Sequence, residues 1–183
     1  MYRSDCLLKE NNTIAWPTWP QYGEEEKEAV KRVIDSNQLF AADRVREFED
    51  NFKSYTGTSF AKGVGNATQG LHLAMAALDI GIGDEVIVTP YTFIASASSI
   101  LMQNAVPVFC DCDPQTRALS AEKIARHLSH RTRAIVVVHM FGYPADMDPI
   151  MELAQKHGLS VIEDVSHAYG AEYKGRRCGG IGD

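Results

Sequence analysis

From Ser59 onward, the sequence alternates between short apolar runs typical of β-strands and longer amphipathic segments typical of α-helices. The strand-like runs are residues 60–64, 85–89, 106–110, 134–139 and 160–164. The helix-like segments between them are residues 68–78, 93–103, 121–128 and 149–157. Alternation of this kind predicts parallel strands whose connecting helices cover both faces of the sheet. We therefore expect an α/β fold with three α/β/α layers and a mainly parallel sheet.

The first 57 residues follow a different pattern. Residues 24–37 carry one apolar stripe and begin with three glutamates, which favour a helix because they complement the helix dipole. A second helix fits residues 43–56, where apolar residues recur at helical spacing and Gly57 provides a stop. We interpret residues 1–57 as a leading segment and helical arm, and residues 58–183 as the main domain.

Size and composition narrow the class of protein. The 183 residues have the length of one domain, and the formal net charge of −6 does not favour nucleic acid or an anionic membrane as a partner. No apolar run approaches the ~20 residues of a membrane span, and residues 1–12 lack the apolar core of a signal peptide. The cysteines lack the spacing of zinc ligands or of a redox pair: Cys6, Cys110, Cys112 and Cys178. We expect a cytoplasmic protein with reduced thiols and no metal site.

Two acidic residues end the last predicted strand. Glu163 and Asp164 lie where open α/β sheets keep their ligand sites, at the carboxyl ends of the strands, and His167 follows three residues later. These side chains could serve one ligand. On this stretch alone, an aspartate that caps a helical turn and a solvated surface histidine explain the pattern at least as well.

The turn at residues 63–70 has glycines, small residues and a hydroxyl at a predicted helix N-terminus, which suits an anion. Thr68 replaces the third glycine of a dinucleotide fingerprint, and residues 71–72 lack the Lys-Ser/Thr of a P-loop. The turn is either a phosphate site without NAD or ATP chemistry or a plain strand-to-helix connection. The aromatics of residues 90–93 lie at the same sheet edge. An anion site, a stacking aromatic and a carboxylate facing a ring nitrogen describe a pocket for pyridoxal 5′-phosphate (PLP).

The sequence resembles the DegT/DnrJ/StrS family of sugar aminotransferases, which are PLP enzymes of fold type I. The resemblance begins at residues 16–26 and extends to residue 183. It is densest in Gly-Asp-Glu-Val-Ile-Val (83–88), Pro-Tyr-Thr-Phe-Ile-Ala (90–95), Pro-Val-Phe-Cys-Asp (107–111), Val-His-Met-Phe-Gly-Tyr-Pro-Ala-Asp-Met (138–147) and Ile-Glu-Asp-Val-Ser-His-Ala-Tyr-Gly-Ala (162–171). It implies an incomplete major domain, without the C-terminal half and the small domain.

Carried over position by position, the resemblance implies specific roles. Asp164 would pair with the pyridinium nitrogen, and His167 would bond the phenolic oxygen of the ring, which makes these two the catalytic candidates. Phe93 would stack on the ring face. Thr68 and the backbone of Gln69 would contact the phosphate. The family's Schiff-base lysine has no counterpart in this sequence.

The implied activity is transfer of an amino group from an amino acid, expected to be glutamate, to a keto-sugar nucleotide or a cyclitol ketone. The resemblance also implies a homodimer. A PLP-dependent sugar dehydratase of the same family, in which histidine replaces the lysine, is one alternative. The other is a truncated, inactive relative that binds a ligand or partner without turnover. We expect these 183 residues alone to be inactive.

Overall fold

The computed structural model describes residues 19–40 and 42–183. The chain divides into two compact units, Met1–Arg46 and Glu47–Asp183, and each is described by itself. The predicted leading segment up to residue 18 lies outside the described residues. The predicted boundary between arm and domain after residue 57 stays a prediction.

Both helices of the predicted arm are confirmed. Helix α1 (Glu24–Ser36) follows Gly23, whose backbone N–H donates to the Glu26 carboxylate at 2.6 Å. It ends at Asn37, which has left-handed backbone angles. Helix α2 spans Asp43–Thr56, as the spacing of its apolar residues predicts.

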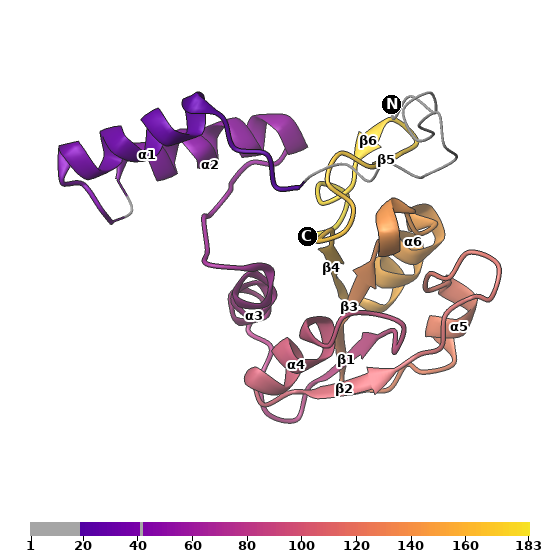
Figure 1. The fold of residues 1–183 in the computed structure, drawn as a ribbon. Helices are drawn as coiled ribbons and strands as arrows, with labels where there is room; N and C mark the ends of the chain where they lie inside the picture. Colours follow the sequence, from indigo (N-terminus) through magenta and orange to yellow (C-terminus); the bar gives the residue numbers. More distant parts are fainter. Residues whose placement is uncertain (1–18, 41) are drawn as a thin grey trace, which may run out of the picture. The chain divides into compact units, whose positions relative to one another are not determined.

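The second unit is built on a parallel sheet with the strand order β2–β1–β3–β4 (Figure 1). Each pair of neighbours is parallel. The register of β3 and β4 places Ala134 opposite Ser160 and Val138 opposite Asp164, so the two strands end together. The strands are β1 (Glu85–Val88), β2 (Val106–Phe109), β3 (Thr132–Val138) and β4 (Ser160–Asp164).

Helices cover both faces of this sheet, which confirms the predicted three-layer α/β/α fold. One face packs against α3 (Ala67–Ala77) and α4 (Ala95–Met102), and the other against α5 (Ala121–Ala125) and α6 (Met147–His157). Strand residues alternate between the two faces. The first core contains Leu71, Met75, Val86, Val88, Ile100 and Val136. The second contains Ile87, Ile124, Ile135, Val137, Ile150 and Val161.

The predicted strand at residues 60–64 is wrong. This segment connects α2 to α3 without pairing to any strand in the described part of the chain, and Phe60 is 87% exposed. An apolar run becomes a strand only where a neighbouring strand offers its backbone groups. The sheet begins instead at β1.

Helix α6 begins earlier than its sequence indicates. Asp148 has the residue type of an N-cap and precedes a proline, yet it lies inside the first turn. Asp146 occupies the N-cap position, without a side-chain capping bond. The Asp148 carboxylate is instead engaged by the Lys174 ammonium, a tertiary contact that the local pattern does not reveal.

After β4, a hairpin of β5 (Glu172–Tyr173) and β6 (Arg176–Arg177) brings the chain back to β4. The Asp183 N–H donates to the Val161 carbonyl at 2.9 Å, and the Val161 N–H donates to the Asp183 carboxylate at 2.8 Å. A Cβ at Gly182 would stand 2.4 Å from the Val161 oxygen, so only glycine fits there without a backbone shift. None of the helices in the described part of the chain is long and apolar enough to cross a bilayer.

Candidate functional site

A pocket of about 300 Å³ lies at the carboxyl ends of β3 and β4. Its walls come from the start of α3, the turn before α4, and the segments that follow the two strands. It is lined by Asn66, Ala67, Thr68, Thr92, Phe93, Ala95, Val138, Met140, Asp164, Ser166 and His167. Four of the five predicted site residues, Thr68, Phe93, Asp164 and His167, are among them.

Asp164 lies at the centre of the polar contacts in this pocket and is 7% exposed. Its Oδ2 accepts a hydrogen bond from the Ser96 hydroxyl at 2.7 Å. Its Oδ1 accepts from the Ser166 hydroxyl at 2.6 Å and from the Ser166 N–H at 3.1 Å. A carboxylate has about four acceptor positions, so these donors fix its plane and leave room at Oδ2 for one more donor.

The serines that hold Asp164 are not recognisable from the sequence alone. Ser96 lies in α4, fully buried, and its hydroxyl also meets that of Thr92 at 2.8 Å. A serine on the apolar face of a predicted helix was the available signal, because a buried hydroxyl needs a partner. Ser166 directly follows the strand-end motif and makes an Asx-type turn with Asp164.

His167 is exposed, and its ring is oriented by an aromatic neighbour. Phe141 stacks against it with ring centroids 5.8 Å apart and an interplanar angle of 15°. Tyr91 in turn meets the edge of Phe141 at 6.4 Å. Phe141 has a φ of 53°, in the left-handed region that non-glycine residues rarely occupy, and strain of this kind concentrates at functional sites.

The start of α3 offers an anion site, but one predicted donor is already used. Asn66 caps the helix, and its side chain accepts from the Gln69 N–H at 3.0 Å. The Gln69 side chain turns back to accept from the Gly65 N–H at 3.0 Å. A phosphate that used the Gln69 backbone would therefore replace Asn66. Thr68 lines the pocket, and the first-turn N–H groups of a helix have no partner within the helix.

Phe93 is 65% exposed and lines the pocket just before α4. An aromatic ring held open to solvent beside a cavity that contains a buried carboxylate suits stacking on a planar ligand.

No lysine lines this pocket in the described part of the chain. The Lys62 ammonium pairs with Glu49 at 3.1 Å, and Lys174 pairs with Asp148.

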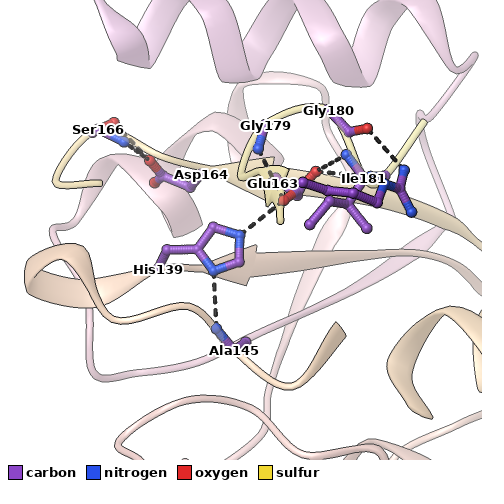
Figure 2. A network of polar contacts seen from close by, with 10 residues as sticks. His139, Ala145, Glu163, Asp164, Ser166, Gly179, Gly180 and Ile181 are labelled. Atoms are coloured by element: carbon purple, nitrogen blue, oxygen red, sulfur yellow. Dashed lines mark hydrogen bonds and ion pairs between the residues drawn. The ribbon is translucent and has the colours of Figure 1, made fainter. Parts of the chain in front are cut away.

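Glu163, the other acid at the end of β4, takes no part in the pocket. Successive strand residues face opposite sides of a sheet, so Glu163 points toward the α6 face. There it accepts hydrogen bonds from His139 and from the backbone of the C-terminal turn (Figure 2). The sequence gives no sign that His139, Glu163 and Cys178 lie together, with ligand atoms within 4.8 Å of one another.

Comparison with known proteins identifies the class. A sequence model of the DegT/DnrJ/EryC1/StrS aminotransferase family matches residues 20–183. The chain belongs to this family, whose enzymes depend on PLP. Its fold is correspondingly part of a fold type I domain.

Among the relatives, a GDP-perosamine synthase of Caulobacter vibrioides is 43% identical over 165 residues, which cover 90% of this chain and 44% of the relative. An L-glutamine:2-deoxy-scyllo-inosose aminotransferase of Streptomyces lividus is 40% identical over 176 residues, which cover 92% of this chain and 42% of the relative. The X-ray structure of an aminotransferase from Psychrobacter cryohalolentis superposes with a TM-score of 0.88 at 48% sequence identity. The match covers 92% of this chain and 43% of that chain. The chain thus spans less than half the length of the relatives it matches.

Proposed function

We propose that this chain is the cofactor-binding part of a PLP-dependent aminotransferase. The acceptor is a keto-sugar nucleotide or a cyclitol ketone, the substrate types in the names of the relatives. The observation that carries the proposal is the buried Asp164 carboxylate, which is held by three donors and retains an acceptor position toward the pocket. PLP supplies an electron sink for the negative charge that develops at the α-carbon of the amino donor.

The polar groups of the pocket fit that cofactor. With PLP bound, the buried Asp164 carboxylate would accept the ring N–H, and its negative charge would hold the proton on the ring nitrogen. Ser96 and Ser166 keep the carboxylate in the plane of that bond. The Thr68 hydroxyl and the N-terminus of α3 would hold the phosphate, whose charge the helix dipole would favour.

His167 and Phe93 orient the ring. His167 lines the pocket, and the stack with Phe141 limits the rotation of its imidazole. With PLP bound, this imidazole would hydrogen-bond the phenolic oxygen. Phe93 would cover one face of the bound ring and shield that face from water. These contacts hold the cofactor so that the reacting bonds are aligned, which is how positioning lowers a barrier.

The amino donor is glutamate or glutamine. We expect glutamate from the family resemblance, whereas the name of the Streptomyces lividus relative specifies glutamine. Both amino acids therefore belong in the assay. A homodimer remains part of the proposal. The exposed apolar side chains on α4 and just before it that do not line the pocket support a partner surface: Ile94, Leu101 and Met102.

Replacing Asp164 tests the proposal in the full-length protein. Asp164→Asn keeps the shape of the side chain but removes the charge opposite the ring nitrogen. We expect amination of the ketone, followed by mass spectrometry of the product, to fall by roughly 10²-fold or more. The unfolding midpoint should change little. Asp84→Asn, a carboxylate at the amino end of β1, is the matched control and should keep full activity. Near-wild-type turnover in Asp164→Asn would remove Asp164 from the mechanism.

A further inference from the structure

Behind the pocket, on the other face of the sheet, Glu163 forms a closed hydrogen-bond network (Figure 2). Its side chain is 3% exposed. Oε1 accepts from the Ile181 and Gly182 N–H groups, both at 2.7 Å. Oε2 accepts from the Gly179 N–H at 3.0 Å and from His139 Nε2 at 2.9 Å. Four donors match the four acceptor positions of a carboxylate, so the group is fully satisfied inside the protein.

His139 is held in one tautomer by its two partners. Its ring is completely buried. Because Nδ1 accepts from the Ala145 N–H at 3.0 Å, it carries no proton, and Nε2 carries the hydrogen that is donated to Glu163. Burial alone raises the pKa of Glu163. The bonds from His139, Gly179, Gly182 and Ile181 outweigh that effect, and the pKa lies below its usual value. The pair is therefore a neutral imidazole and a carboxylate.

The same histidine also contacts the residue that faces the pocket. The His139 backbone N–H donates to the Asp164 carbonyl oxygen at 3.1 Å. His139 is thus hydrogen-bonded to two successive residues of β4. Its ring donates to the Glu163 side chain, and its backbone N–H donates to the Asp164 backbone. Any rotation of β4 that turned the Asp164 carboxylate out of the pocket would have to break this double contact.

The second partner of His139 closes the loop that carries Phe141. The bond from Ala145 to His139 Nδ1 ties residue 145 back to residue 139. Within this closed loop, Phe141 stacks on His167. A Cβ at Gly142 would stand 3.7 Å from the His167 carbonyl oxygen, so the loop backbone also lies against that residue.

We propose that His139 and Glu163 are positioning residues that set the orientation of Asp164 and His167 from the opposite face of the sheet. We call this pair the His139–Glu163 clamp. The inference rests on the proposed function for the roles of Asp164 and His167, but the coupling itself is a property of this chain. The proposal gives a role to Glu163, which does not line the pocket although its carboxylate has every acceptor position filled.

A metal ion is the competing use of these side chains, because Cys178 lies within 4.8 Å of the ligand atoms of both. In the structure, both ring nitrogens of His139 and both oxygens of Glu163 are engaged by protein groups. A metal would have to displace the His139–Glu163 bond and at least one backbone donor. The hydrogen bonds therefore favour the clamp.

Two substitutions of His139 separate its two side-chain contacts. In His139→Gln, the amide nitrogen reaches the place of Nε2 and can still donate to Glu163, while the acceptor for Ala145 is lost. In His139→Asn, the amide oxygen takes the place of Nδ1 and can still accept from Ala145, but no donor reaches Glu163. Glu163→Gln keeps the shape and replaces one acceptor with a donor that faces N–H groups. Glu85→Gln, another strand glutamate with a buried carboxylate, at the amino end of β1, is the control for destabilisation alone.

The measurements are made on the full-length protein with each variant. We expect His139→Asn and Glu163→Gln to weaken PLP binding and lower kcat by roughly 10- to 100-fold, with the absorption maximum of bound PLP displaced. His139→Gln should keep PLP binding closer to that of the wild type, because Glu163 retains its donor. Its absorption maximum should still move, because the lost Ala145 contact no longer closes the loop whose Phe141 stacks on His167. Glu85→Gln should lose stability without changing PLP binding or spectrum. If Glu163→Gln and Glu85→Gln differ from wild type only in stability, the clamp is wrong.

A readout without cofactor separates failure of the clamp from failure of the proposed function. In the PLP-free protein, ¹⁵N spectra of the histidines should show His139 with the proton on Nε2, and Glu163→Gln should shift the His167 signals. If the wild-type protein binds no PLP, the proposed function is refuted. If Glu163→Gln nevertheless shifts the His167 signals relative to the wild type, the clamp is supported. Unshifted His167 signals would overturn the clamp. So would stoichiometric zinc in purified protein that is lost in His139→Asn.

Discussion

At the scale of single residues, the pocket depends on hydroxyl groups that hold a carboxylate. Ser96 is the only described donor to Asp164 Oδ2, whereas Ser166 provides two donors to Oδ1. Loss of the Ser96 hydroxyl would leave a buried oxygen without a protein partner. Loss of the Ser166 hydroxyl would leave the Ser166 N–H in place. The two serines are therefore not equivalent.

We predict that Ser96→Ala destabilises the protein by about 1–3 kcal/mol and Ser166→Ala by about 0.5–1.5 kcal/mol. Urea unfolding measures both. Added PLP should recover part of the loss in Ser96→Ala, because the ring N–H then satisfies Oδ2. Ser98→Ala, in the same helix as Ser96 but without a hydrogen bond to Asp164, should be nearly neutral. Equal losses for all three serines would contradict this account.

At the scale of elements, β4 and the segment that returns to it act together. Residues 179–182 surround the Glu163 carboxylate, and Asp183 exchanges two hydrogen bonds with Val161. This return depends on a close backbone approach at Gly182, whose missing Cβ leaves space for the Val161 oxygen.

Gly182→Ala should therefore destabilise the protein by about 1–3 kcal/mol, because the added Cβ forces the segment away from β4. Hydrogen exchange followed by mass spectrometry should show faster exchange in the peptide that contains residues 178–183. Gly81→Ala is the matched control, since a Cβ there meets nothing within 4 Å. It should be neutral or slightly stabilising. Wild-type exchange in Gly182→Ala would refute the close approach.

The elements also show what the sequence could predict. The periodicity of apolar residues located β1 to β4 and the helices α1 to α6 of the described residues, because each element that buries one or both faces leaves a periodic pattern. The 60–64 run has the same apolar character and forms no strand, because pairing depends on partners far along the chain. The role of Asp164 stays a prediction, but its place at the edge of a pocket was predictable from the strand-end pattern. Ser96 and His139 were not, because their roles arise only when separate elements pack together.

At the scale of the whole molecule, acid should act on stability through carboxylates bound in the folded state. The pKa is lowered for Glu163, and also for Glu85, held by Ser129 and Arg131, and for Asp113, held by the backbone of Thr116 and Gln115. A carboxyl group with a lowered folded-state pKa contributes stability above its unfolded pKa and loses it as the pH falls through the folded value.

We therefore predict that the stability contributed by these carboxylates is fully present at neutral pH and is lost as the pH falls below the ordinary glutamate pKa of 4.5. Glu163→Gln should be less stable at neutral pH but less sensitive to acid. Urea unfolding at a series of pH values measures both effects. A Glu163→Gln variant with the acid sensitivity of the wild type would show that this carboxylate does not contribute.

Glu163 and Asp164 are neighbours in sequence but serve opposite sides of the sheet, and this has a consequence for protein design. A designer who transplants the pocket residues into another α/β scaffold would copy Asp164, His167, Phe93 and Thr68. The side chains behind the sheet would be left out, since they touch no ligand. Such a graft would place the pocket side chains on a strand end that is free to rotate. The His139–Glu163 clamp should therefore be transferred together with the pocket residues.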